Sequence, residues 1–157
     1  MNPYLITALP VGPGVLAKLI RMIPIQSLDR PTHPGRFSPR EVLAHLSDWE
    51  PILLERIKRT VADPGCLILG VDEEERAREQ RYEEKDPLFE ADRFAALRFE
   101  TMEWLSELSD DDWQKSSVHS ERGEMSVSDQ ANLLLGHDLY HIQQLCDALT
   151  PSSVGTW

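Results

Sequence analysis

The sequence predicts an all-α protein, an antiparallel four-helix bundle with a long crossover between helices 2 and 3. Three observations support this fold class. Four stretches carry apolar residues at intervals of three and four, the spacing of one helix face. Helix-start signals precede three of these stretches, and no stretch shows the strong apolar pattern of a strand. The length of 157 residues suits a single domain, which we expect to span residues 1–157.

The first helix is expected over residues 13–23. Its inward face is formed by Leu16, Leu19, Ile20 and Ile23. Pro24 ends the helix, because proline lacks the backbone donor that a further turn needs. Two earlier prolines leave a start near Pro3 open.

The second helix has the clearest start in the chain. Ser38 precedes Pro39, and Glu41 follows three residues after Ser38, which is a capping box with proline at the first helical position. Pro51 lies inside the helix and predicts a kink or a loosened turn. The helix is expected to end at residues 63–65, and its inward stripe is Val42, Leu46, Trp49, Leu53 and Ile57.

A polar connection, residues 66–86, is expected before the third helix. Its part from Asp72 to Asp86 holds eight acids against four bases, which favours a solvated linker with at most a helical turn. Asp86 and Pro87 then begin the third helix. This helix is expected to end near residue 109, with an inward face of Phe94, Leu97, Thr101, Trp104 and Leu108.

An irregular segment with a turn at Gly123, residues 113–125, is expected before the fourth helix. Ser126 caps this helix, and Asp129 places a negative charge in its first turn. Pro151 is expected to close it, and its inward stripe is Leu134, His137, His141, Leu145 and Ala148. Up-down-up-down order is the default for four such helices, although the sequence does not determine the order.

The net charge of −11, from 27 acids and 16 Lys and Arg, argues against binding to nucleic acid or to an anionic membrane. The apolar runs are too short to cross a bilayer, and the N-terminus lacks the features of a signal peptide. Two cysteines, Cys66 and Cys146, do not form a disulfide framework. We therefore expect a cytoplasmic protein with a small-molecule substrate.

The most informative feature of the sequence is a histidine pair in the fourth helix. His137 and His141 lie four residues apart, so both imidazoles project from one face, one turn apart. That face is the inward stripe, where two imidazoles need partners for their ring nitrogens. A metal ion would provide them, and the alternative is a pair of hydrogen-bonded core histidines. His45 borders the inward face of the second helix, so three neutral imidazoles can converge on zinc, nickel or another divalent ion.

The sequence resembles the DinB-like superfamily, which includes bacillithiol transferase-like and mycothiol-dependent enzymes. The resemblance rests on residues 38–50 (SPREVLAHLSDWE) and 136–145 (GHDLYHIQQL), and covers most of the chain. Supporting residues are Tyr82, Arg98, Asp111 to Trp113, His119 and Gly123. It implies a four-helix bundle, often dimeric, with a divalent metal held by His45, His137 and His141. Many members have tryptophan where this chain has Phe37, which we expect to affect packing at the entry to the second helix.

The resemblance further implies a metal-dependent transferase that uses a low-molecular-weight thiol. The alternatives are a metal-dependent hydrolase, a ligand-binding or sensor bundle without turnover, and a purely structural bundle. The candidate substrate-binding residues are Trp49, Tyr82 and Arg98. The alternative for both aromatic residues is ordinary core packing, and for Arg98 a structural ion pair. Asp48 and Asp138 could orient an imidazole. His119 is expected to be exposed, with a place at the mouth of the pocket as the alternative, and no residue stands out as general base.

Overall fold

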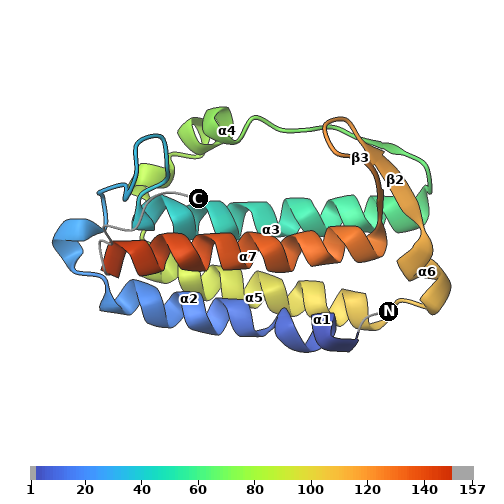
Figure 1. Cartoon of the computed structure of the whole chain (residues 1–157), viewed down its shortest axis with the longest axis horizontal. Helices are drawn as coiled ribbons and strands as arrows, with labels where there is room; N and C mark the ends of the chain where they lie inside the picture. Colours follow the sequence, from blue (N-terminus) through green and yellow to red (C-terminus); the bar gives the residue numbers. More distant parts are fainter. Residues whose placement is uncertain (1–2, 150–157) are drawn as a thin grey trace.

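Four long helices lie side by side in the computed structural model, which describes residues 3–149 (Figure 1). They are α2 (Val11–Met22), α3 (Pro39–Ala62), α5 (Pro87–Ser106) and α7 (Val127–Leu149). A short helix, α1 (Pro3–Ala8), precedes α2, and a 3-10 turn (Ile25–Ser27) follows it. The predicted four-helix bundle and its crossover between the second and third long helices are confirmed.

The order of helix directions differs from the default. Arg40, at the start of α3, donates a hydrogen bond of 2.8 Å to the carbonyl oxygen of Lys85, just before α5. The helices α3 and α5 therefore begin at the same end and run parallel, whereas α2 and α7 run the opposite way (Figure 1). The up-down-up-down expectation is wrong, because the crossover brings the chain back along the length of the bundle before α5 starts.

The helix boundaries follow the capping signals. The Ser38 hydroxyl accepts from the Glu41 amide at 3.4 Å, and the Glu41 carboxylate accepts from the Ser38 amide at 2.8 Å. Asp86 accepts from the Leu88 amide at 2.9 Å and so caps α5. The helix α3 continues through Pro51 to Ala62. Pro151, expected to close α7, lies outside the described residues.

A small three-stranded sheet at one end of the bundle corrects the predictions of a polar linker over residues 66–86 and an irregular segment over residues 113–125. Its strands are β1 (Leu67–Ile68), β2 (Ser116–His119) and β3 (Gly123–Ser126), with β1 parallel and β3 antiparallel to β2. Strands of two to four residues are too short to show a period in the sequence. The connections also contain α4 (Glu73–Glu79), a 3-10 turn (Tyr82–Glu84) and α6 (Asp110–Gln114).

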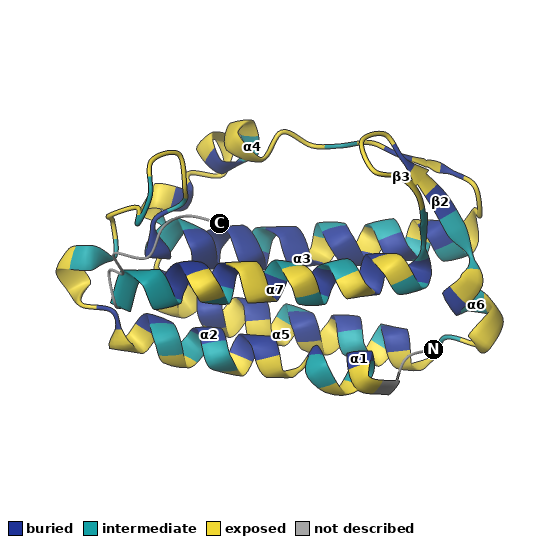
Figure 2. Ribbon diagram, viewed as in Figure 1, coloured by how far each residue is buried: buried dark blue, intermediate teal, exposed yellow. Residues whose placement is uncertain are grey.

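Buried residues lie along all four long helices (Figure 2). A small apolar cluster of Ala44, Ala77 and Tyr82 lies between α3 and the crossover. Two large apolar clusters lie toward opposite ends of the bundle. One contains Leu53, Leu105 and Leu134, and the other contains Leu46, Phe94 and Leu145. The three long helices α3, α5 and α7 each contribute buried polar residues at the level between these clusters; these are His45, Glu50, Arg98, Thr101, Asp138 and His141. This polar layer contains the candidate site.

The N-terminal stretch Tyr4–Met22 corrects the expectation that no apolar run reaches membrane-spanning length. Its mean hydropathy of 1.4 and its length of 19 residues suffice for a candidate span among the described residues. A core helix of a soluble protein meets the same criterion. Here Leu5, Leu16 and Ile20 are buried in the two apolar clusters, so the stretch packs as part of the bundle.

Candidate metal site

Three imidazoles converge between α3 and α7 in the polar layer. The Nε2 atom of His137 lies 2.8 Å from Nε2 of His45 and 3.1 Å from Nε2 of His141. One ring nitrogen from each residue lies within 4.8 Å of the other two. The antiparallel course of α3 and α7 brings these residues together although 92 positions separate His45 from His137. The structure thus assembles the three histidines selected from the sequence.

Hydrogen bonds among the rings cannot satisfy this arrangement. The Nε2 atom of a neutral His137 carries either one hydrogen or one lone pair, so it can form one hydrogen bond in the ring plane. It has two imidazole nitrogens within 3.1 Å. A cation shared by three lone pairs would satisfy all three nitrogens, so the donor set fits a divalent ion of the kind that imidazole binds.

Gln144 fixes the orientation of His141. The amide oxygen Oε1 of Gln144 lies 2.6 Å from Nδ1 of His141. Because this oxygen can only accept, Nδ1 donates its hydrogen, and the neutral ring keeps its lone pair on Nε2, toward the other histidines. This is the nitrogen that a metal ion would need.

His45 is held by aromatic packing. Its ring centroid lies 5.1 Å from that of Phe37, 5.5 Å from that of Trp49 and 6.2 Å from that of Tyr82. Its Nδ1 atom is buried and has no hydrogen-bond partner within the described part of the chain. The polar contact of this ring is therefore the one that Nε2 makes in the histidine cluster.

All three imidazoles are neutral at physiological pH. Burial is the largest cause that lowers the pKa of each ring from 6.5, to about 2 for His45, about 3 for His137 and about 4 for His141. The neighbouring histidines lower the pKa of His45 and His137 further. Neutral imidazole is the form that binds metals, so burial prepares these residues as ligands.

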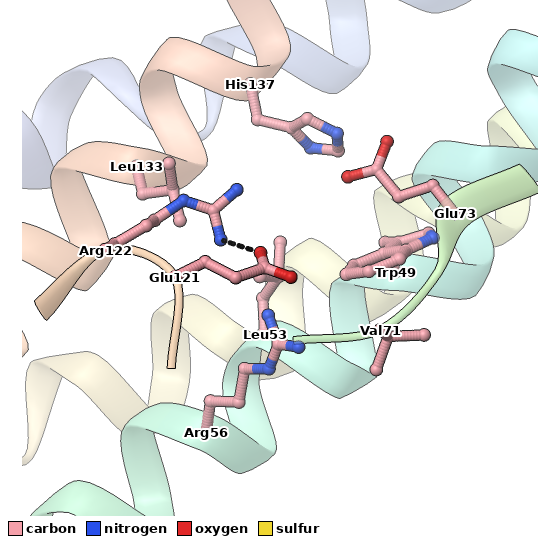
Figure 3. Close-up of a pocket in the computed structure, with 9 residues that line it drawn as sticks. All are labelled: Trp49, Leu53, Arg56, Val71, Glu73, Glu121, Arg122, Leu133 and His137. Atoms are coloured by element: carbon pink, nitrogen blue, oxygen red, sulfur yellow. Dashed lines mark ion pairs between the residues drawn. The ribbon is translucent and has the colours of Figure 1, made fainter. Parts of the chain in front are cut away.

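Two cavities border the cluster, and both are lined by His137 and Glu73. The larger, of about 390 Å³, is also lined by His141 and Gln144. The smaller, of about 60 Å³, lies between α3, α7, the crossover and the β2–β3 hairpin (Figure 3). Its lining residues are Trp49, Leu53, Arg56, Val71, Glu73, Glu121, Arg122, Leu133 and His137. His137 therefore borders both cavities.

The two aromatic candidates for substrate binding lie in different places. Trp49 lines the smaller cavity beside His137. Tyr82 is only 1% exposed, packs behind His45, and donates its hydroxyl to Asp48 at 2.6 Å. Asp48 also accepts from Arg76 at 2.9 Å, so it anchors the crossover to α3. The structure therefore places Trp49 at the cavity and Tyr82 in the core.

Arg98, the third candidate, is paired with two carboxylates inside the bundle. Its guanidinium lies 2.7 Å from Glu50 and 2.6 Å from Asp138, and it donates to the carbonyl oxygen of Leu9 at 3.0 Å. Its side chain is 2% exposed. Arg98 therefore forms the structural ion pair that was the alternative to a role in substrate binding. It also accounts for Asp138, which pairs with Arg98.

Several residues around the cavities were not selected from the sequence. Gln144 follows His141 by three positions, and Arg56 follows Trp49 by seven, so helical spacing alone could have indicated both. Arg122 and Glu73 reach the site from the hairpin and the crossover, which the sequence did not place. His119 was expected to be exposed, but it is only 5% exposed because the hairpin packs against the bundle.

Comparisons with known proteins agree with this fold. The family model of the DinB superfamily matches residues 11–145. A similar solved structure is YfiT from Bacillus subtilis, named as a probable metal-dependent hydrolase with an unusual four-helix bundle topology. The two chains are 20% identical with a TM-score of 0.86 over 92% of this chain and 83% of YfiT. A search of curated proteins found no match.

Two further structures show the same fold at lower identity. The mycothiol-dependent maleylpyruvate isomerase is 13% identical, with a TM-score of 0.71, over 90% of this chain and 59% of the isomerase. The DinB-like protein YjoA from Bacillus subtilis is 12% identical, with a TM-score of 0.64, over 98% of this chain and 94% of YjoA. At these identities the likeness concerns the fold.

Proposed function

The chain belongs to the DinB superfamily, and on this premise we propose that it is a metal-dependent transferase that uses a low-molecular-weight thiol. In this proposal His45, His137 and His141 hold one divalent ion, zinc or nickel. The observation that carries it is the convergence of three neutral imidazole nitrogens beside two cavities. When bound, the ion would supply Lewis acidity that lowers the pKa of a neighbouring thiol or water.

The side chains of the protein prepare the site for this chemistry. Gln144 keeps the lone pair of His141 directed at the site, and the packing of Phe37 and Trp49 holds the ring of His45 in place. Because both cavities are lined by His137, a thiol and an electrophile can approach the same point from different sides. Holding two reactants in this way removes much of the entropic cost of their encounter.

Hydrolysis is the second candidate activity. It is supported by the likeness to YfiT, which is named as a probable metal-dependent hydrolase and shares the fold over most of both chains. Water would then take the place of the thiol at the same site. A bundle that binds a ligand without turnover remains the non-enzymatic alternative, and it predicts no activity with any thiol or ester.

Metal analysis of the purified chain tests the proposal. After incubation with zinc or nickel and removal of free ion, about one ion per chain is expected. His137→Ala and His141→Ala should abolish uptake, whereas His33→Ala in the loop before α3 should not change it. Uptake below about 0.1 ion per chain by the unaltered protein would contradict the metal site. Assays of the loaded protein with a thiol plus an electrophile, and with esters, then separate transfer from hydrolysis.

We further propose a small-molecule substrate, no nucleic-acid or membrane partner, a cytoplasmic location and a homodimer. Sizing chromatography tests the dimer, because the chain mass is 17.9 kDa. An apparent mass of about twice this value is expected of a dimer. Elution at the mass of one chain at micromolar concentration would contradict it.

A further inference from the structure

Two arginine side chains in the smaller cavity beside His137 have no carboxylate oxygen within hydrogen-bond distance in the described part of the chain. Arg56 comes from α3 and Arg122 from the β2–β3 hairpin, and both line this cavity with His137 (Figure 3). Arg98, by contrast, lies within 2.7 Å of both Glu50 and Asp138. The buried Arg98 thus has two carboxylates in close contact, whereas the positive charges of Arg56 and Arg122 are less completely neutralised by nearby acids.

Arg56 is held in position by neutral groups. Its Nη2 atom donates to the carbonyl oxygen of Leu69 at 3.0 Å, and its guanidinium lies over the Trp49 ring at 5.5 Å. Burial, and next the positive charge of Arg122, lower the pKa of Arg56, although Glu121 and Glu73 act in the opposite direction. Its position is therefore fixed while its charge is incompletely compensated.

Arg122 is also weakly paired. Its nearest acid among the described side chains is Glu121, at 4.0 Å, which is beyond hydrogen-bond distance. Its Nη1 atom lies 3.2 Å from Nε2 of His119. The amide of Glu121 donates to Nδ1 of His119 at 3.2 Å, which uses the single lone pair of the neutral ring. The ring therefore offers Arg122 no acceptor.

The Glu121 carboxylate lies between the two guanidinium groups in Figure 3. Its side chain is 62% exposed, so it is not fixed there by burial. It also rests against Gly70, where a Cβ atom would lie 2.2 Å from Oε1 of Glu121. Glu121 thus occupies the position that a carboxylate of a bound molecule would take.

We propose that the molecule bound at the site carries a carboxylate, which displaces Glu121 and is held by Arg56 and Arg122. The guanidinium fork matches a carboxylate in two parallel hydrogen bonds. The cavity volume of about 60 Å³ accommodates a carboxylate on a short stem that ends near His137. This inference rests on the proposed function, because the other end of the molecule reacts at the metal site. The carboxylate belongs either to the thiol or to the second substrate.

Paired probes test the inference and distinguish these sources. The zinc-loaded chain is titrated by calorimetry with 3-mercaptopropionate and with 3-mercapto-1-propanol, which differ only in the carboxylate. If the thiol carries the carboxylate, the acid should bind about tenfold more tightly. The metal-free chain is titrated with succinate, which should bind wherever the arginine pair accepts a carboxylate without a thiol.

Variants with opposite expected effects sharpen the test. Arg56→Gln and Arg122→Gln should remove the advantage of the acid, and Arg56→Lys, which keeps the charge but not the fork, should reduce it. Glu121→Gln should tighten binding of the acid by about threefold, because the competing carboxylate is removed. Arg78→Gln and Glu83→Gln change the net charge equally at exposed positions of the crossover and should have no effect.

Each outcome decides between the hypotheses. If both thiols bind equally but succinate binding depends on Arg56, the carboxylate belongs to the second substrate. If both thiols bind equally and succinate does not bind, the inference is wrong while the metal site stands. If neither thiol binds and succinate binding depends on Arg56, the proposed function fails while the carboxylate site stands. If neither thiol binds and succinate does not bind, both fail.

Discussion

A single amide determines which nitrogen of His141 faces the candidate site. Gln144 accepts the Nδ1 hydrogen of His141 at 2.6 Å, and this leaves the Nε2 lone pair free for a metal ion. Gln144 is itself 9% exposed, so water does not readily replace it as the acceptor. The affinity of the site should therefore depend on a residue that is not a ligand.

Gln144→Met should weaken zinc binding by about 10- to 100-fold, because it removes this acceptor at similar side-chain size. Gln144→Glu keeps an acceptor and should retain most of the affinity. Competition with a chromogenic chelator measures both values. Gln143→Met, at the exposed neighbouring position, is the matched control. Equal affinities for Gln144→Met and Gln143→Met would contradict the orienting role.

The buried imidazoles also predict a pH dependence of the metal-free chain. Their pKa values of about 2, 3 and 4 lie below the ordinary 6.5, so below about pH 6.5 the unfolded chain takes up protons that the folded chain does not. The free energy of unfolding should therefore decrease as the pH is lowered below 6.5, by up to about 1.4 kcal/mol per pH unit for each histidine. Above pH 6.5 these three residues contribute no slope.

Urea unfolding of chelator-treated protein at pH 7, 6 and 5 measures this slope. In His141→Leu, one of the three titrating groups is absent, so the slope should be shallower than in the unaltered chain. An unfolding free energy that does not change between pH 7 and 5, or the same slope in the variant, would contradict the assignment of neutral buried rings.

At the scale of single residues, the sequence predicted the histidine cluster better than the cavity wall. His45, His137 and His141 were found because helical spacing shows which positions face inward. The partners of long side chains are not determined by spacing. Arg98 was a candidate substrate-binding residue with a structural ion pair as the alternative, and its guanidinium pairs with Glu50 and Asp138, carboxylates on two other helices. Choosing between these alternatives required the packing of the helices.

At the scale of elements, the helices were predictable because their starts have local physical causes. Ser38 and Asp86 each cap a helix through their own side chains, so the evidence lies within a few adjacent residues. The strands have two to four residues and are stabilised by partners distant in sequence, such as Leu67 beside Val118. The parallel course of α3 and α5 likewise depends on the path of the crossover, for which no local signal exists.

The contact between α2 and α7 gives a prediction about two glycines in one helix. A Cβ atom on Gly12 would lie 2.2 Å from Oδ2 of Asp138, whereas one on Gly14 would meet nothing within 4 Å. Gly12→Ala should therefore lower the free energy of unfolding by about 1–3 kcal/mol, because Asp138 is held by Arg98 and cannot easily move. Gly14→Ala should raise it by about 0.5–1 kcal/mol through helix propensity.

Thermal or urea unfolding of the two variants measures the expected decrease in stability for Gly12→Ala and the expected increase for Gly14→Ala. Gly14→Ala controls for the effect of alanine on α2 itself. A Gly12→Ala protein as stable as Gly14→Ala would show that α2 and α7 do not approach each other this closely.

At the scale of the whole molecule, the charge of −11 is not confined to surfaces remote from the site. The sequence places eight of the acids between Asp72 and Asp86, in the predicted polar linker. The structure places the start of α4 over the bundle, so that Glu73 and Glu74 line the larger cavity. Glu73 also lines the smaller cavity beside its two arginines. These acids repel anions in general, so an anion binds there only if it contacts the arginines directly.

The two apolar halves of the bundle meet at a polar layer centred on Arg98. Its ion pairs join α3 through Glu50 to α7 through Asp138, and it also bonds to Leu9 between α1 and α2. Thr101 donates to Glu50 at 2.7 Å and completes the network. These hydrogen bonds and ion pairs fix the positions of the long helices along one another. The same layer therefore fixes where α3 and α7 place His45, His137 and His141.

Arg98→Met should therefore lower the free energy of unfolding by about 3–5 kcal/mol, because it leaves Glu50 and Asp138 buried without a counter-charge. Arg21→Met is the control: Arg21 on α2 pairs with Asp92 of α5 at 3.5 Å, both side chains are more than half exposed, and the change should cost less than about 1 kcal/mol. The triple variant Glu50→Gln, Arg98→Met, Asp138→Asn removes the charges together and should recover part of the loss. Urea unfolding measures all three. If Arg98→Met unfolds at the same urea concentration as Arg21→Met but loses activity, Arg98 binds substrate and the structural assignment is wrong.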